Sequence, residues 1–302
     1  MIIVIEQVAI LFVFAIAGYI LSKAKIVKPE QAQILSNLLV YVFLPANIFK
    51  TFVKNCTLEY ILGRYEILLV GIASVIIIAA LSHFGTKLLS KKDYERKIYE
   101  YSMIVPNFGY MGSALAESLI GAEGLLNCMM IFIPVSLYTY TVGFCILSKR
   151  ELSFKKLINP VMISLVLGMI CGICRLKLPN IAEQIVVKAS SCMAPVSMLL
   201  TGIVISEYEI GKLITHKNTY ITVLFRLVII PVTVGLAVKK ILGAEIARYC
   251  VMFYAMPCGL NTVVFPKMVG EDCKIGAGLA FISNIAACIT IPVIFGFFGI
   301  AV

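Results

Sequence analysis

The chain has 302 residues, of which 61% are hydrophobic and 14% charged, and its formal net charge is +10. Soluble domains carry about 25% charged residues, so this composition, with a mean hydropathy of +1.00, argues against a soluble protein and indicates a polytopic membrane protein. The basic residues are spread over many short connections and form no single face, which argues against a nucleic-acid partner.

Apolar runs close to the roughly 20 residues that cross a bilayer recur along the whole chain and predict ten spans. The first is expected to be a retained helix and not a cleaved signal, because it lacks a basic start and carries Glu6. The ten predicted spans are residues 2–22, 31–52, 66–89, 98–121, 124–147, 158–175, 181–206, 218–238, 246–269 and 275–299.

Lys and Arg are about twice as frequent in the odd-numbered connections between spans as in the even-numbered ones, and the positive-inside rule places the richer side in the cytoplasm. Both termini are therefore predicted to lie outside.

The two halves of the chain match at an offset of about 150 residues, a period long enough to hold several helices. The matches are Gly18 with Gly168, Lys25 with Arg175, Pro29 with Pro179, Pro45 with Pro195 and, at a slightly different offset, Pro106 with Pro257. Residues 1–150 and 151–302 are therefore predicted to be two five-helix repeats. An odd number of spans inverts the second copy, and inverted repeats in secondary transporters place the substrate site between them at mid-depth.

The predicted fourth span contains helix breakers at its midpoint, in the sequence IVPNFGYMG of residues 104–112. Pro106 should end a first half-helix at Val105, and Asn107 can cap a second one with its side chain. Gly109 and Gly112 let another backbone or a ligand come close. A broken helix in hydrocarbon persists only where its free backbone groups meet protein or line a cavity.

The equivalent part of the ninth span, AMPCGLNTVVF at residues 255–265, contains Pro257, Gly259 and Asn261. We expect the two breaks to cross near mid-membrane, where converging half-helix N-termini favour a carboxylate or another small anion. The alternative is that Pro and Gly are common in membrane helices without any functional role.

Six segments of the chain resemble the auxin efflux carrier family, which includes plant PIN auxin carriers and bacterial malate and malonate permeases. They are LVYVFLPANIF (39–49), VPNFGYMGSAL (105–115), LINPVMISLVLG (157–168), MAPVSMLLTG (193–202), FRLVIIP (225–231) and AMPCGLNTVVF (255–265).

The resemblance implies an all-α fold of ten helices in two inverted repeats, with broken crossing helices 4 and 9 like those of bile-acid/sodium symporters and sodium/proton antiporters. It also implies a scaffold from spans 1, 2, 6 and 7, a transport domain from spans 3–5 and 8–10, and a homodimer. By motif position the substrate site falls on Pro106, Asn107, Gly109, Pro257, Gly259 and Asn261. Only SKRELSFKKL separates the halves, where many plant members carry a long hydrophilic loop, so a bacterial-type transporter of the cytoplasmic membrane is expected.

Arg226 lies well inside the eighth span, where a charge is costly and marks either function or a buried partner. It is a candidate ligand of the substrate anion, and the alternative is a structural bond to Glu117 or to a helix carbonyl. Lys188 and Glu6 are near span ends and can snorkel. Five other intramembrane polar residues are candidates for lining the pathway or for hydrogen-bonding links between helices, and links are the favoured interpretation: Asn37, Asn47, Ser191, Ser197 and Asn284.

An enzyme is not expected, because His83 and His216 are the only histidines and no HExxH or paired membrane Asp occurs. No metal or cofactor is predicted, and Cys171 and Cys174 are interpreted as packing residues. The predicted function is transport of a small organic anion by alternating access: a mono- or dicarboxylate such as malate, or an auxin-like aromatic acid. A channel or a ligand sensor embedded in the membrane stays open as the alternative.

Overall fold

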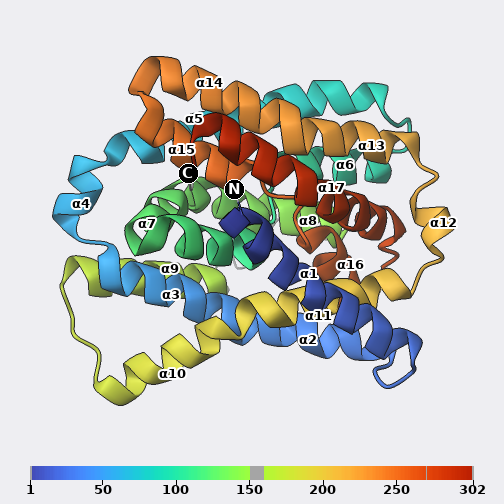
Figure 1. Cartoon of the computed structure of the whole chain (residues 1–302), viewed down its shortest axis with the longest axis horizontal. Coiled ribbons are helices and arrows are strands. Elements are labelled where there is room, and N and C mark those ends of the chain that lie inside the picture. The colour runs from blue at the N-terminus through green and yellow to red at the C-terminus, as the bar shows by residue number, and fades with distance from the viewer. Residues whose placement is uncertain (1, 150–159, 270, 301–302) are drawn as a thin grey trace.

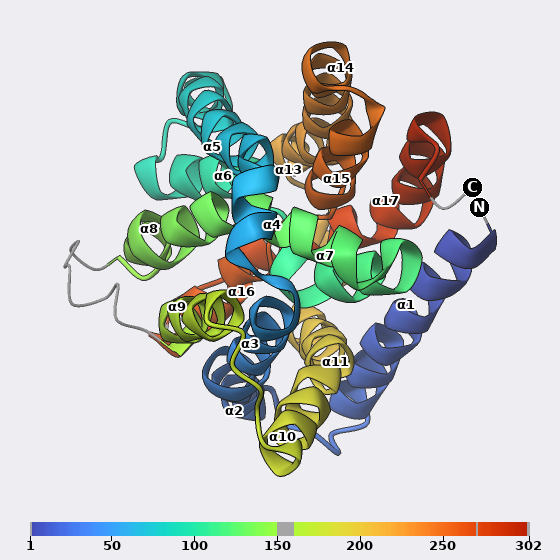
Figure 2. The same cartoon turned by 90° about the vertical axis from the view of Figure 1, so that its left-hand side faces the viewer.

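The computed structural model describes residues 2–149, 160–269 and 271–300, and almost all of them are helical. Most helices lie along the horizontal axis of Figure 1, and Figure 2 views them end-on as two groups. The panel group, in the lower half of Figure 2, consists of α1 (Ile2–Lys23), α2 (Ala32–Leu38), α3 (Leu44–Asn55), α9 (Pro160–Ile173), α10 (Asn180–Ser191) and α11 (Met193–Ser206), with the π-helical turn η2 (Leu39–Phe43) joining α2 to α3.

The core group forms the rest of the molecule. It consists of α5 (Tyr65–Gly85), α6 (Asp93–Ile104), η4 (Phe108–Gly112), α7 (Ser113–Tyr138), η5 (Thr139–Gly143), α8 (Phe144–Leu147), α13 (Lys217–Leu224), η7 (Phe225–Ile229), α14 (Ile230–Leu242), α15 (Ala244–Tyr254), α16 (Asn261–Met268) and α17 (Lys274–Phe298). Short connectors complete the chain: η1 (Pro29–Gln31), α4 (Leu58–Gly63), η3 (Thr86–Leu88) and α12 (Ile210–Leu213).

Within the described residues, six helical segments are long and apolar enough to cross a membrane: Ala32–Lys54, Tyr65–Leu88, Phe108–Leu147, Asn180–Ser206, Lys217–Leu242 and Lys274–Phe298. Val8–Lys23 and Pro160–Ile173 are shorter apolar helices. Large apolar side chains such as Ile16, Ile76 and Phe297 are exposed on the outer surface, as expected where lipid replaces water. The chain is thus an all-helical, multi-pass membrane protein, and the count of ten spans remains a prediction.

The longest apolar segment is divided at Gly121, whose φ of 70° and ψ of −175° are non-helical. Residues before Gly121 belong to the predicted fourth span and residues after it to the fifth. The left-handed φ is one that glycine adopts without a steric penalty. One glycine therefore separates two of the predicted spans that periodicity alone would join.

The ends of α1 and α9 have the same backbone geometry. Lys25 and Arg175, matched at the 150-residue offset, both adopt left-handed conformations with φ of 59° and 52°. In each case the N–H of the next residue donates to a carbonyl five residues earlier, at 3.0 Å after α1 and 2.9 Å after α9. This is the Schellman motif, which supplies hydrogen-bond donors to carbonyls at the C-terminal end of a helix. The shared geometry is what the predicted internal repeat requires.

The panel helices pack through small residues at equivalent positions. A Cβ added to Gly18 would lie 2.1 Å from the carbonyl oxygen of Leu199, because α1 and α11 touch backbone to backbone. A Cβ on the matched Gly168 would lie 3.0 Å from the Cβ of Phe52 on α3. Small residues allow close van der Waals packing in lipid, where no hydrophobic force drives helices together.

Candidate functional site

Helical geometry stops at both places where proline was expected to interrupt a span. α6 ends at Ile104, and Val105 is extended with φ −103° and ψ 108°. The helix resumes at Phe108 in η4 and continues into α7. In the second half, α15 ends at Tyr254 and α16 begins at Asn261. Val105 therefore ends the first half-helix, as predicted.

The two interruptions pair with each other through their backbones. The N–H of Asn107 donates to the carbonyl of Pro257 at 2.8 Å, and the N–H of Gly259 donates to the carbonyl of Val105 at 3.1 Å. Together they form an isolated antiparallel bridge between segments 105–107 and 257–259, which we call the paired interruptions. Each segment satisfies donors and acceptors that the broken helices leave free, and an unsatisfied group in lipid costs several kcal/mol.

A glycine permits the close approach at this contact. A Cβ on Gly259 would lie 3.0 Å from the carbonyl oxygen of Val105, which accepts the hydrogen bond. A Cβ on Gly112 would lie 2.7 Å from the side chain of Met256, so it too permits a close approach. Gly109 differs, because its added Cβ would meet side chains only at ordinary contact distances of 3.6 Å and more.

Asn107 is 1% exposed and precedes the second half-helix. Its carbonyl accepts hydrogen bonds from the N–H groups of Met111 and Gly112, at 3.1 and 3.0 Å. The side chain makes no cap bond, so the predicted side-chain N-cap is wrong. In the described part of the chain neither its Oδ1 nor its Nδ2 has a hydrogen-bond partner. Leaving such a buried group unpaired costs about 1–3 kcal/mol.

Asn261 is also buried, but both polar atoms of its amide are hydrogen-bonded. The hydroxyl of Tyr110 donates to its Oδ1 at 2.9 Å, and its Nδ2 donates to the hydroxyl of Tyr101 at 3.1 Å. Tyr101 lies on α6 and Tyr110 on η4, so these side chains connect the first interruption to the start of α16. Sequence reasoning missed both tyrosines. Their signal was a hydroxyl within one or two turns of Pro106, in an otherwise apolar stretch.

Arg226 is fully buried on η7 and connects the ends of two helices. Its Nη1 donates to the carbonyl of Met103 at 2.8 Å, and its Nη2 donates to the carbonyl of Tyr254. These carbonyls belong to the last turns of α6 and α15, immediately before the interruptions. The guanidinium carbon also lies 5.5 Å from the centre of the Tyr254 ring.

The bonds of Arg226 match the structural alternative in which it binds a helix carbonyl. Helix C-termini carry partial negative charge and free carbonyls, and a buried guanidinium neutralises two such ends here. Glu117, the other suggested partner, bonds to Lys50 instead. A direct role for Arg226 in substrate binding stays a prediction.

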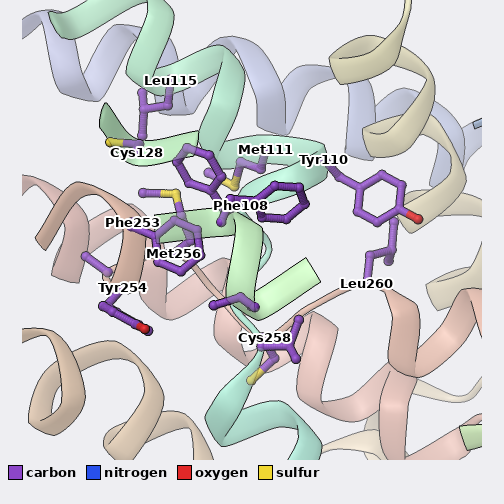
Figure 3. Close-up of a cluster of buried hydrophobic side chains, with 14 of the residues drawn as sticks. Phe108, Tyr110, Met111, Leu115, Cys128, Phe253, Tyr254, Met256, Cys258 and Leu260 are labelled. Atoms are coloured by element: carbon purple, nitrogen blue, oxygen red, sulfur yellow. The ribbon is translucent and has the colours of Figure 1, made fainter. Parts of the chain in front are cut away.

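Aromatic and sulfur-containing side chains pack tightly beside the paired interruptions (Figure 3). The rings of Phe108 and Phe253 are 4.7 Å apart between centroids, and the ring of Phe132 lies 6.0 Å from that of Phe108. In Figure 3 the ring of Tyr110 is directed away from this cluster. The interruptions thus have an apolar side, where the cluster packs, and a polar side, where Tyr110 bonds to Asn261.

The predicted linking role of intramembrane polar residues is confirmed for two of them. Asn47 donates to the hydroxyl of Ser113 at 3.2 Å and accepts from that of Ser190 at 2.9 Å. Ser197 donates to the carbonyl of Tyr110 at 3.3 Å. Both residues thus connect the panel group to η4 and α7, the helical segment that follows the interruption at residues 105–107.

Two observations concern the residue types that hold metals, in the part of the chain that the structure describes. No group of three or more His, Cys, Asp or Glu side chains could hold a metal ion there. Cys171 and Cys174 are free thiols.

The molecule contains many apolar helices, and two of its predicted spans are interrupted and pair with each other inside it. This arrangement defines a polytopic membrane protein of the transporter class. The chain belongs to the membrane transport protein family, the auxin efflux carriers, whose model matches residues 3–157 and 148–295. It is 24% identical over 293 residues to an uncharacterized transporter of Methanocaldococcus jannaschii, covering 92% of this chain and 94% of the relative. The boundary between the two matched segments lies near the middle of the chain, close to the boundary between the two predicted repeats. Family membership places the chain among transporters and not enzymes.

Proposed function

We propose that this protein is a secondary carrier of a small organic anion, either a mono- or dicarboxylate such as malate or an auxin-like aromatic acid. Its binding site would be the polar side of the paired interruptions, where Asn107 and Asn261 meet the substrate carboxylate. The observation that carries the proposal is the unpaired, buried amide of Asn107 beside the start of a half-helix.

The charges around the paired interruptions favour an anion. The C-terminal ends of α6 and α15 are bonded to Arg226, which offsets their partial negative charge. The half-helices that begin at Phe108 and Asn261 both start at the paired interruptions, and a helix N-terminus carries partial positive charge. The positive ends would therefore attract an anion, while the negative ends are compensated.

In this proposal the panel group is the scaffold and the core group is the transport domain. Alternating access would result from movement of the core group against the panel group, which exposes the paired interruptions to each side in turn. The carrier would act as a homodimer in a bacterial-type cytoplasmic membrane, with both termini outside.

Substrate counterflow in proteoliposomes tests the proposal, with a panel of mono-, dicarboxylic and aromatic acids. We expect accelerated exchange for at least one acid, and at least a tenfold loss in Asn107→Ala and in Asn261→Ala. Asn284→Ala is the matched control, because its buried Oδ1 is also unpaired, but it lies on α17 outside the paired interruptions and its Nδ2 donates to a carbonyl of its own helix.

Intact counterflow in both well-folded asparagine variants would refute the site. Conductance without accelerated exchange would favour a channel. Binding of the acids without either would favour a ligand sensor.

A further inference from the structure

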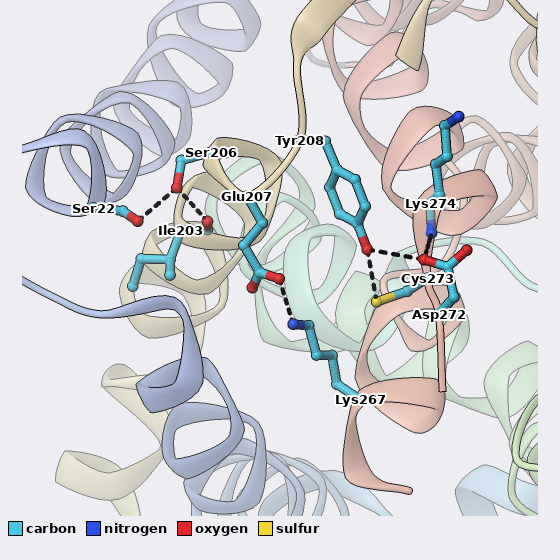
Figure 4. Close-up of polar contacts among 9 residues, drawn as sticks. All are labelled: Ser22, Ile203, Ser206, Glu207, Tyr208, Lys267, Asp272, Cys273 and Lys274. Atoms are coloured by element: carbon cyan, nitrogen blue, oxygen red, sulfur yellow. Dashed lines mark hydrogen bonds and ion pairs between the residues drawn. The ribbon is translucent and has the colours of Figure 1, made fainter. Parts of the chain in front are cut away.

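Two ion pairs connect the panel group to the core group, and neither lies at the paired interruptions. Lys50 on α3 donates to both carboxylate oxygens of Glu117 on α7, at 2.9 and 3.1 Å. Glu207, directly after α11, accepts from Lys267 on α16 (Figure 4). In the first pair the panel group carries the cation, and in the second it carries the anion.

The two pairs lie at opposite ends of the helices. α4, which follows α3 in the chain, is at the left of Figure 1, and α12, which follows α11, is at the right. An offset of 150 residues also relates Glu117 to Lys267 in sequence. The repeat thus places a charged residue of opposite sign on the core group at each end, and each finds a partner on the panel group.

The two ends differ in how tightly they are closed. The end with Lys50 and Glu117 has a cavity of about 490 Å³, lined also by Lys54, Lys177 and Glu183, and the Glu117 side chain is 42% exposed. At the other end the Glu207 side chain is only 14% exposed, while the two lysines are similarly exposed, Lys50 at 22% and Lys267 at 24%. The first end is therefore the more open one in this structure.

A second contact strengthens the tighter end. The hydroxyl of Tyr208, next to Glu207 in the chain, donates to the thiol of Cys273 at 3.3 Å and lies 3.5 Å from Oδ1 of Asp272 (Figure 4). Cys273 belongs to the core-group segment before α17 and is buried. Glu207 and Tyr208, adjacent residues of the panel side, thus contact the core group at this end. Because Cys273 is buried at this contact, its accessibility to a thiol reagent is a measure of whether the contact is intact.

We propose that Lys50–Glu117 and Glu207–Lys267 are two gates, one at each end of the transport pathway, and that each breaks when its own end opens. The inference rests on the proposed function, because it takes the panel and core groups as the bodies that move. A partly buried pair is stable only while both charges keep their partner, so separation of the groups at one end exchanges that pair for water. Breaking one gate by mutation should shift the population toward the state open at that end.

The reaction of Cys273 with N-ethylmaleimide tests this in the full-length protein in nanodiscs, with labelling measured by peptide mass spectrometry. Lys267→Gln should raise the labelling rate of Cys273 about fivefold, the scale expected for loss of one ion pair. Lys50→Gln breaks the opposite gate and should lower that rate. The charge swap Glu207→Lys with Lys267→Glu should restore slow labelling.

Lys212→Gln is the matched control, because Lys212 pairs with Glu209 within one exposed segment at the same end. It should leave the labelling rate unchanged. Cys250, buried on α15 within the core group, should stay unlabelled in every folded variant. If Lys267→Gln does not fold, Glu207→Gln breaks the same pair from the other side.

An unchanged Cys273 rate in a folded Lys267→Gln or Glu207→Gln protein would overturn the gates. An equal rise in Lys50→Gln would also do so, because it would indicate general loosening. Counterflow of the same variants in proteoliposomes separates the two proposals: normal exchange with unchanged labelling rejects only the gates, whereas absent exchange in the wild type rejects the carrier even where labelling changes as expected.

Discussion

Asn107 and Arg226 are both buried at the paired interruptions, but their hydrogen bonding differs. Both Nη groups of Arg226 bond to main-chain carbonyls and its Nε has no partner, while neither polar atom of the Asn107 side chain has a partner among the described residues. A charge in the membrane interior is tolerated when it is paired. An unpaired amide has a free-energy cost that a ligand can remove, which is why Asn107 is the stronger candidate for substrate contact.

Replacement of Arg226 by glutamine should destabilise the protein. The carbonyls of Met103 and Tyr254 would lose their donors inside the molecule, at about 1–3 kcal/mol for each unsatisfied group. We expect the apparent Tm in detergent to fall by several degrees, measured by thermal unfolding of the purified protein. Arg226→Lys keeps one charged donor and should give a smaller decrease.

Arg248→Gln serves as the comparison for this effect, because Arg248 is an exposed arginine on α15. Its Tm should match that of the wild type. An unchanged Tm in Arg226→Gln, with weaker binding of the substrate anion, would instead assign Arg226 to the substrate site.

At the scale of elements, α6 and α15 both stop inside the molecule, and the extended segments that follow pair with each other. The prolines remove donors and prevent the helices from continuing. Gly259 permits the approach, since its N–H reaches the carbonyl of Val105 at 3.1 Å. The π-helical turns η4 and η7 lie beside this place, consistent with the frequent occurrence of such turns at functional sites.

Gly259→Ala should separate the paired interruptions. The added methyl would lie 3.0 Å from the Val105 carbonyl oxygen, and overpacking of this kind costs about 1–3 kcal/mol. Both thermal stability and counterflow should decrease. Gly85→Ala in α5 is the control, because a Cβ there meets no atom within 4 Å, and it should change neither property. If the two variants had equal thermal stability and equal counterflow, the backbone contact between Gly259 and Val105 would not be close enough to exclude a methyl group.

Sequence reasoning at this scale located the interruptions, because proline and its preceding residue have local steric effects that need no tertiary information. It assigned Asn107 a cap bond that the structure does not contain. The cap was predicted from local propensity, whereas here the backbone of Asn107 bonds to Pro257, which is 150 residues away in the chain.

For the whole molecule, the distribution of Lys and Arg predicts which end faces the cytoplasm. Cys174 is exposed in the connection after α9, on the predicted outer side. A membrane-impermeant maleimide should therefore label Cys174 in intact cells, and Cys174→Ser should abolish that signal. Labelling of Cys174 only after permeabilisation would reverse the predicted orientation.

The sequence by itself determined the membrane class, the family, the internal match at about 150 residues and the places where two helices break. Hydropathy, proline sterics and repeated motifs act over a few residues or at a constant offset, so they can be read without a structure. Only the tertiary structure decided the partners of Arg226, the tyrosines around Asn261 and the two ion pairs between the groups. Each of these contacts joins side chains far apart in the chain, and their meeting depends on how whole helices pack.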